Sequence, residues 1–229
     1  MYNRRQNVFM AKKLLSQIIY NSAYVEGCNV TFPQTETILQ GMRVNNVKVD
    51  DIQTIINLRD AWNFILNHLD ESIDLKFINK VNEHISRNES LDWGVLRSGN
   101  VGISGTNYRP KVPNEIEVIQ KLKEIKKIVD PVEKASEYFC WAAHVQLYWN
   151  GNKSTSIVVA NAILIREGGG LFTIGEETAE EFNEKLLWLY NQNDAEPLKL
   201  YIKNQIEAVS QQFSFEKENQ ENTGMQQSM

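Results

Sequence analysis

The sequence predicts a mainly α-helical protein with one small β-hairpin. Apolar residues recur at intervals of three and four along most of the 229 residues, which is the spacing of one face of an α-helix. Only residues 92–113 depart from this pattern, because apolar residues alternate there and glycines interrupt the segment. The hydrophobic fraction of 42% is ordinary for a globular chain that buries a full core. We therefore expect one domain, or one domain with a small appendage.

The N-terminal part of the chain predicts four helices. Gly27 is a typical stop for the first of them. Asp50 or Asp51 can cap the third, and Asp74 can cap the fourth, because a side-chain carboxylate at this position accepts hydrogen bonds from the free amides of the first turn. The expected ranges are 7–26, 31–40, 51–69 and 74–85.

Residues 92–113 contain the one good β-hairpin signal. Val101 and Ile103 alternate with glycines, and Tyr108 follows a Ser104-Gly105 turn. The last residues of the chain are polar and low in complexity, which predicts a disordered tail. Between hairpin and tail we expect helices at 114–128, 131–149, 152–166, 178–191 and 196–212.

Charge and composition argue against several classes of protein. The net charge of −5 disfavours a broad nucleic-acid interface, which needs a basic face. No run of 18 apolar residues is present, and Lys12 and Lys13 interrupt the apolar N-terminal stretch, so we expect neither a membrane span nor a signal peptide. The two cysteines, Cys28 and Cys140, have no metal-binding spacing. We expect a cytoplasmic protein with no nucleic-acid or membrane partner.

A tight turn joins the two long helices expected around residue 150. Asn150, Gly151 and Asn152 tolerate turn conformations, and Lys153 and Ser154 then open the next helix. The free amides of a helix N-terminus attract anions, and a lysine and a hydroxyl beside them would strengthen a phosphate site. The alternative, which the local sequence favours, is that Asn152 only caps the helix.

Three separated segments resemble the Fic family. Residues 146–154 read Gln-Leu-Tyr-Trp-Asn-Gly-Asn-Lys-Ser and resemble the family's active-site loop, H-x-F-x-(D/E)-G-N-(G/K)-R. Residues 22–27 read Ser-Ala-Tyr-Val-Glu-Gly and resemble its inhibitory motif, (S/T)-x-x-x-E-(G/N). Residues 94–113 resemble the flap that clamps the target protein. The resemblance implies a Fic-type helical bundle with a β-hairpin flap.

The resemblance also implies a division of the chain. An N-terminal helical segment with the inhibitory-like motif covers residues 1–45, and a Fic-like core domain covers residues 46–213. The disordered polar tail then covers residues 214–229.

The loop departs from the Fic pattern at the positions that carry the family's chemistry. In the family, a histidine deprotonates a target hydroxyl that attacks the α-phosphate of ATP, a carboxylate holds Mg²⁺, and two arginines bind phosphates. These positions are Gln146, Asn150, Ser154 and Ile157 here. A glutamine cannot act as a base, an asparagine offers Mg²⁺ no negative charge, and neither serine nor isoleucine neutralises a phosphate. The candidate anion-binding residues that remain are Gly151, Asn152, Lys153 and Ser154.

The resemblance assigns two further groups of residues. The inhibitory motif is Ser22, Glu26 and Gly27. We expect Glu26 to have lost its partner, since Ile157 replaces the arginine that would hold it. The flap residues are Val101, Gly102, Ile103, Ser104 and Gly105.

His144 is the one histidine near the loop that could substitute for the missing base. It precedes Gln146 by two residues, roughly 200° around a helix, so we expect it to face away from the catalytic side.

Two functional hypotheses follow. The first is a pseudoenzyme, a Fic scaffold that binds a protein or a nucleotide without transferring AMP, because base, metal ligand and phosphate ligands are lost together. The second is an active transferase with altered chemistry that moves AMP or another phosphate-containing group. The cofactor is ATP with Mg²⁺ or none, and the expected partner is a protein at the flap. A homo-oligomer is compatible with either hypothesis.

Overall fold

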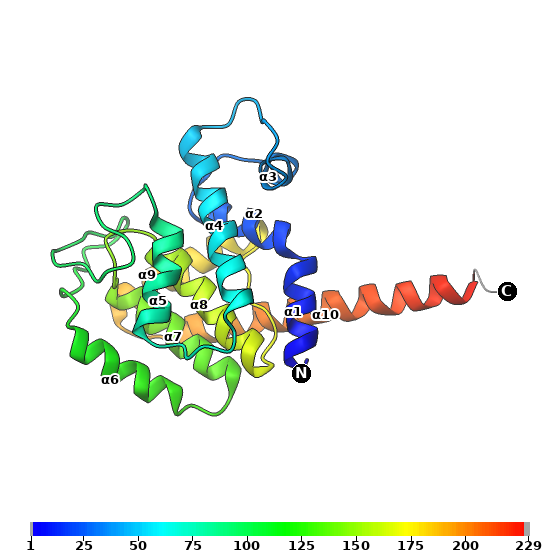
Figure 1. The fold of residues 1–229 in the computed structure, drawn as a ribbon. Helices are drawn as coiled ribbons and strands as arrows, with labels where there is room; N and C mark the ends of the chain where they lie inside the picture. The colour runs from blue at the N-terminus through cyan, green and yellow to red at the C-terminus, as the bar shows by residue number, and fades with distance from the viewer. Residues whose placement is uncertain (1, 227–229) are drawn as a thin grey trace.

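Helix α8 lies at the centre of the fold. It spans Asn152–Glu167, and every residue from Ser154 to Ile165 is buried. Helices α7, α5, α4 and α1 pack around it (Figure 1). A helix covered on all sides needs apolar or small residues on every face, and α8 has them. The structure is a computed structural model that describes residues 2–226, with side chains described through residue 213.

None of the helices within residues 2–226 is both long enough and apolar enough to cross a lipid bilayer.

The prediction of a mainly helical protein is confirmed. The helices are α1 (Arg4–Lys13), α2 (Leu15–Val25), α3 (Phe32–Leu39), α4 (Val49–Asn67), α5 (Leu75–Ser86), α6 (Glu115–Lys126), α7 (Pro131–Val145), α8, the 3₁₀ helix η1 (Glu176–Thr178), α9 (Ala179–Gln192) and α10 (Glu196–Gln226).

Several expected helix limits are wrong. The first expected helix is two helices, because the backbone leaves the helical conformation at Leu14. Helix α1 packs against α8, whereas α2 packs against α4. Helix α7 ends at Val145 rather than at residue 149. Neither Asp50 nor Asp51 caps α4, since Lys48 is the N-cap. Both carboxylates lie in the first turn, where their negative charge interacts favourably with the positive end of the helix dipole. The cap at Asp74 is confirmed: its Oδ1 accepts a hydrogen bond from the Phe77 amide at 3.0 Å.

The ends of the chain leave two predictions untested. Helix α10 continues to Gln226 and extends away from the bundle (Figure 1), although we expected its end near residue 212. The side chains of 214–226 and all of 227–229 lie outside the described part, so disorder over 214–229 stays a prediction. The expected boundary at residue 45 falls in the loop between α3 and α4, and a separate N-terminal segment also stays a prediction.

The expected β-hairpin is absent, because no strand occurs in the described chain. Residues 99–113 form an irregular flap that turns at Ser104 and Gly105. Pro110 and Pro113 remove amide donors from the returning arm, which weakens any strand ladder there. Thr106 Oγ1 instead donates to Asn191 Oδ1 of α9 at 2.5 Å, and so ties the flap to that helix.

One buried arginine replaces the missing ladder. The side chain of Arg97 is only 1% exposed, and its guanidinium donates to carbonyl oxygens on both arms of the flap: Gly99 at 2.5 Å and Lys111 at 2.6 Å. Its Nε donates to the Gln146 carbonyl at 2.6 Å, and its backbone amide donates to the Leu147 carbonyl at 3.0 Å. Arg97 therefore ties the flap to the loop after α7. Burial lowers the pKa of its guanidinium, with the nearby Tyr108 opposing that effect.

We predict that Arg97→Met unfolds the flap and destabilises the protein by about 3 kcal/mol or more, because several buried carbonyls lose their donor at once. Chemical denaturation would measure the loss, and hydrogen exchange would locate it in residues 97–111. Arg109→Met is the matched control. Its guanidinium only contacts exposed carbonyls within the flap, so its cost should stay within about 0.5 kcal/mol. Equal costs for the two variants would contradict the role of Arg97.

Candidate functional site

The loop between α7 and α8 begins with a left-handed residue. Gln146 has φ of 52°, and its amide donates to the Ala142 carbonyl at 3.0 Å, which ends α7. Its side-chain amide donates to the Ala143 carbonyl at 2.7 Å and to the Tyr190 hydroxyl at 3.2 Å. The residue at the position of the family histidine is thus held by α7 and α9.

Asn152 clamps the loop rather than facing solvent. It is 8% exposed, its Oδ1 accepts from the Tyr148 amide at 2.8 Å, and its Nδ2 donates to the Tyr148 carbonyl at 2.7 Å. The buried Tyr148 hydroxyl in turn donates to Asn79 Oδ1 at 2.8 Å. Tyr148 is therefore the inward anchor of the loop. Both groups of the Asn152 side chain are used for structure, and neither remains for a ligand.

Asn150 occupies the position of the metal-binding carboxylate. Its Oδ1 accepts from the Gly151 amide at 2.8 Å, and its Nδ2 donates to the Glu89 carbonyl at 3.0 Å. Its own carbonyl accepts from Asn82 Nδ2 at 3.1 Å and from Ser86 Oγ at 3.0 Å. The loop residues present do not fit Mg²⁺, since Asn150 has no charge and its oxygen already has a donor.

Glu26 has two partners on the N-terminal turn of α8, contrary to the expectation that its partner was lost. Ser154 Oγ donates to Glu26 Oε1 at 2.5 Å, and Lys153 Nζ lies 3.6 Å from Glu26 Oε2. Lys153 Nζ also donates to the Val25 carbonyl at 2.5 Å. The serine that replaces the first arginine thus binds the glutamate directly. We call this set of contacts the Glu26 latch.

The rest of the inhibitory-like motif shapes the end of α2. Ser22 is buried, and its Oγ donates to the Ile18 carbonyl at 2.8 Å within the helix. Gly27 has φ of 86°, a conformation that L residues rarely adopt, and follows the Glu26 cap. The predicted stop at Gly27 is therefore confirmed, and the turn presents Glu26 to the loop.

His144 belongs to an aromatic stack instead of the loop. Its ring stacks on that of Tyr108 with centroids 4.4 Å apart, and the Tyr108 hydroxyl lies 3.2 Å from Nδ1. Tyr190 belongs to the same aromatic cluster, with its ring centroid 5.9 Å from that of Tyr108 and 6.5 Å from that of His144. Burial lowers the pKa of His144, which favours the neutral ring. His144 does not line the cleft described next.

A cleft of 420 Å³ lies between the flap, the loop and α9. Four of the five predicted flap residues line it, and the fifth, Gly105, packs against Leu187 instead. Trp149 also faces the cleft, and its ring lies directly on Gly99. The lining residues are Glu26, Val101, Gly102, Ile103, Ser104, Gln146, Trp149, Asn150, Gly151, Asn152, Lys153, Asn183, Leu186, Leu187 and Tyr190. Lys153 is the one cation among them, and no arginine or histidine is present.

An acidic cavity of 600 Å³ lies behind the loop and shares Glu26, Asn150 and Gly151 with the cleft. Asp50, Asp51 and Glu89 also line it. Burial raises the pKa of Glu89, although a hydrogen bond from Thr54 opposes this. Within the described residues, no three histidine, cysteine or acidic side chains are placed to hold a metal ion.

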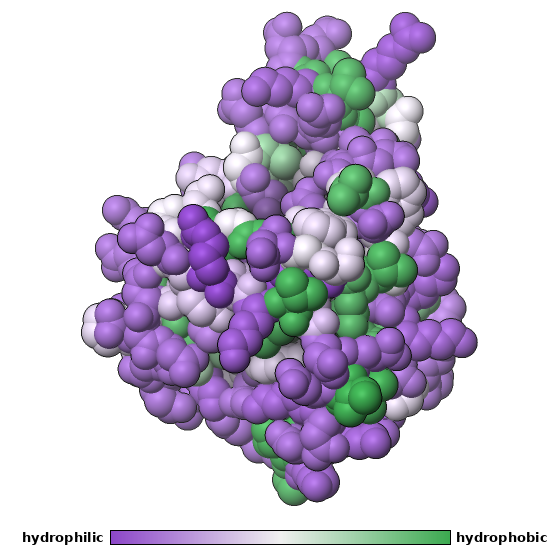
Figure 2. Space-filling model, turned by 90° about the vertical axis from the view of Figure 1, so that its left-hand side faces the viewer, coloured by the Kyte–Doolittle hydropathy of each residue, from purple (hydrophilic) through white to green (hydrophobic). Residues whose placement is uncertain are grey.

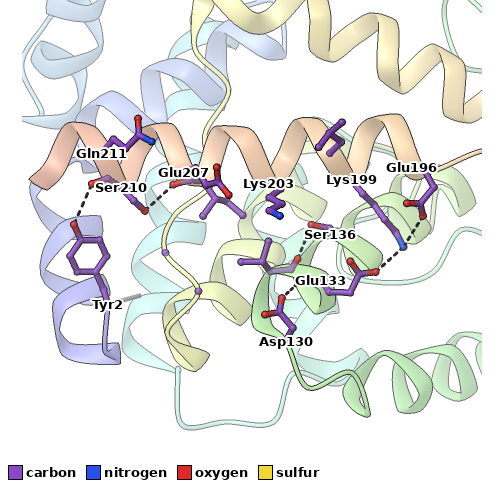
Figure 3. A pocket seen from close by; sticks show the side chains of 15 residues that line it. Tyr2, Asp130, Glu133, Ser136, Glu196, Lys199, Lys203, Glu207, Ser210 and Gln211 are labelled. Carbon is purple, nitrogen blue, oxygen red and sulfur yellow. Dashed lines mark hydrogen bonds and ion pairs between the residues drawn. The ribbon is translucent and has the colours of Figure 1, made fainter.

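A third cavity shares no residue with the cleft. It is a groove of 1130 Å³ between α10, the start of α7 and the turn at Gly169 and Gly170 (Figure 3). Lys199 lies in it between Glu133 at 3.0 Å and Glu137 at 2.8 Å. Burial would lower the pKa of Lys199, but hydrogen bonds to both carboxylates outweigh this and raise it. A permanently charged and paired lysine serves α7–α10 packing, and we assign the groove no chemistry.

Sequence reasoning missed the polar residues that support the loop. Asn79, Asn82 and Ser86 all reach it from α5, and Tyr190 reaches it from α9. The three α5 residues lie at helical spacing on one side of an amphipathic helix, next to buried Val81 and Ile85. These polar residues within an apolar helix face were the sequence signal that could have predicted buried hydrogen-bond partners for the loop.

The sequence resembles known Fic proteins. No family model matches the chain. The Protein adenylyltransferase Fic of Drosophila melanogaster is 24% identical over 201 residues, which cover 83% of this chain and 40% of that protein. The corresponding protein of Drosophila willistoni is 23% identical over the same length. The chain thus spans about 40% of the length of these relatives.

Solved structures agree on the fold. Residues 134–508 of Fic-1 from C. elegans align with a TM-score of 0.77 and 21% identity, covering 92% of this chain and 67% of that one. A Fic domain containing signaling protein from Bacteroides thetaiotaomicron aligns with a TM-score of 0.73 and 19% identity, covering 88% and 86%. The chain has the fold of these Fic proteins and resembles them in sequence. It retains the loop turn and the glutamate at the end of α2, with neutral residues at the positions of the family's catalytic side chains.

We predict that Gly151→Ala destabilises this domain by about 2–3 kcal/mol. A Cβ atom at Gly151 would lie 2.4 Å from Ser86 Oγ and 2.6 Å from Ile85 Cγ2, in a loop that cannot move away. Gly27→Ala is the control. It has a similar positive φ, but nothing lies within 4 Å, so it should cost only about 1 kcal/mol of backbone strain. Thermal unfolding would compare them, and equal costs would show that the loop adapts.

Proposed function

We propose that this protein is a Fic-fold binding protein that does not transfer AMP efficiently. One observation carries the proposal: the side chains at the catalytic and ligand positions of the loop are hydrogen-bonded within the chain. Gln146 is bound to α7 and α9, Asn150 to its own loop, and Ser154 to Glu26. A phosphate would have to displace these partners, and none of the three replacements carries a charge to favour it.

The lack of a base supports the same conclusion. General acid–base catalysis by a positioned side chain contributes about 10²–10⁴-fold to the rate. Gln146 has no protonation equilibrium near neutral pH, and His144 is stacked on Tyr108 and does not line the cleft. No group that lines the cleft is placed to accept the proton of a target hydroxyl, except Glu26, whose carboxylate is held by the latch.

The walls of the cleft suit a protein partner. Val101 and Ile103 of the flap face Leu186 and Leu187 of α9, with Trp149 beside them. Apolar and aromatic walls with a few amide groups are typical of surfaces that accept side chains of another protein. We therefore place the partner at the flap, as the sequence suggested.

A transferase with altered chemistry is the second candidate. Lys153 lines the cleft and forms an ion pair with Glu26. The side chain of Glu26 is 27% exposed, so a phosphate group could displace it from Lys153. This candidate still needs a base from elsewhere, and relatives named as adenylyltransferases are only 24% identical.

The first test is a calorimetric titration of the protein with ATP, with and without Mg²⁺. We expect no Mg²⁺-dependent heat at millimolar ATP, because the loop offers no charged metal ligand and its cation is paired. Saturable binding that requires Mg²⁺ would contradict the proposal and favour the second candidate. Incubation with α-labelled ATP would then reveal its targets.

We also predict that Gln146→His does not restore AMP transfer. A histidine would return the base, but Asn150, Ser154 and Ile157 would still leave ATP without metal and phosphate ligands. Labelling of the variant by α-labelled ATP is the measurement. Strong self-labelling by this single variant would mean that the phosphate site is intact, and the proposal would fail.

Glu26→Gly should likewise leave transfer undetectable, while lowering stability by about 1–2 kcal/mol. The variant loses the Ser154 and Lys153 contacts and gains backbone freedom at the end of α2. Glu26→Gln is the matched control, because its carbonyl can still accept from Ser154. A large gain of transfer in the glycine variant would show that the latch suppresses an active site.

A further inference from the structure

A second groove lies between α5 and α6 and shares no residue with the cleft. Its volume is 770 Å³, and its floor is apolar: Ile73, Leu75, Ile119 and Leu122. Helix α6 lies at the edge of the bundle, beside α5 (Figure 1). The groove is thus an exposed channel between two helices rather than a hole in the core.

Helix α6 is apolar on its outer side as well as its inner side. Val118 and Ile125 are buried, and Lys121 pairs with Glu137 of α7 at 2.7 Å, which fixes the inner side. Ile116 is nevertheless 78% exposed and Ile119 37% exposed. A surface helix normally has one apolar stripe, so the outer isoleucines are not explained by packing against the bundle.

Other exposed apolar residues lie outside α6, next to lining residues of the groove in the sequence. Gly94 lines the groove, and its neighbours Trp93 and Val95 are 39% and 50% exposed. Val112, just before α6, is 42% exposed. Figure 2 shows this side of the molecule, where apolar residues interrupt the hydrophilic surface at several places. Of the exposed apolar residues, Ile119 lines the groove itself, and Trp93 and Val95 flank its lining residue Gly94. Exposed apolar side chains at a groove are typical of a binding surface.

The charges along the groove are separated. Lys126 Nζ donates to Ser72 Oγ at 3.4 Å, so the end of α6 lies beside the start of α5. Lys76, Lys123 and Lys126 gather at this end, and none of them forms an ion pair within the part of the chain that the structure describes. The carboxylate here is Asp74, whose Oδ1 caps α5.

The opposite end of the groove is acidic. It carries Glu115 and Glu83, and Lys80 pairs with Glu83 at 2.7 Å. In a protein with a net charge of −5, the three unpaired lysines form a local basic site at one end only. An occupant with an acidic end would therefore bind in one orientation.

We propose that the groove binds an amphipathic helix of a partner protein, with its apolar face on the floor and its acidic C-terminal end beside the lysines. A groove between two helices suits the apolar face of a third, with anchors at helical spacing. The twelve residues of α6 extend about 18 Å, which matches three turns of such a helix. The negative end of the helix dipole would also lie at the lysines. This inference is independent of AMP transfer.

The probe is a fluorescent amphipathic peptide of about sixteen residues, with leucines on one face and glutamates in its C-terminal half. We expect saturable binding with a Kd in the micromolar range by fluorescence anisotropy. Ile119→Asp and the double variant Lys123→Glu with Lys126→Glu should each weaken it at least about tenfold. The matched controls are Val129→Asp and Lys127→Glu, which alter exposed residues outside the groove and should bind as the original does.

Three results would overturn the proposal. The first is no binding of the peptide, and the second is equal binding of a peptide with lysines in place of its glutamates. The third is a dimer in sedimentation that Ile119→Asp dissociates, which would assign the groove to a second copy of this chain. Circular dichroism would verify that each variant is folded, which is expected because all the altered side chains are at least partly exposed. The ATP titration is unaffected by any of these outcomes.

Discussion

The guanidinium of Arg97 holds together the parts of the molecule that make its cleft. The flap has no strand pairing, and the loop after α7 leaves the helical conformation at Gln146, so neither has a regular hydrogen-bond pattern of its own. A planar group with five N–H donors can serve carbonyls that point to one place from different segments. Arg97 does this for both arms of the flap and for Gln146. The position of flap and loop relative to each other therefore depends on one side chain.

Three residues at the positions of the Fic family's catalytic and ligand-binding side chains share a physical property. Gln146, Asn150 and Ser154 are neutral, and each can donate a hydrogen bond and also accept one. In this structure each one completes a contact within the chain: with Tyr190, with the Gly151 amide and with Glu26. A charged side chain at such a position would require a ligand or a counter-ion to offset its desolvation. The neutral set stabilises the loop without any ligand, so the fold does not depend on the charged residues of the Fic pattern.

A shared fold and a shared activity are separate questions for this protein. The alignment with C. elegans Fic-1 concerns the path of the backbone, and a shared fold does not carry a reaction. The same scaffold leaves two hollows with apolar walls, one in the cleft beneath the flap and one between α5 and α6. Both are formed by groups far apart in the sequence, and both depend on irregular segments between helices.

The sequence by itself determined the helical class, the Gly27 stop, the Asp74 cap and the absence of charged residues at three loop positions, because these follow from local spacing and residue type. Only the tertiary structure decided that residues 99–113 form no hairpin, since Arg97 binds carbonyls that strand pairing would have used. It also decided that Glu26 binds Ser154 and Lys153. Glu26 and Ser154 are 128 positions apart in the sequence. Local patterns predict backbone conformation, whereas the partner of a polar side chain depends on which distant segment packing brings beside it.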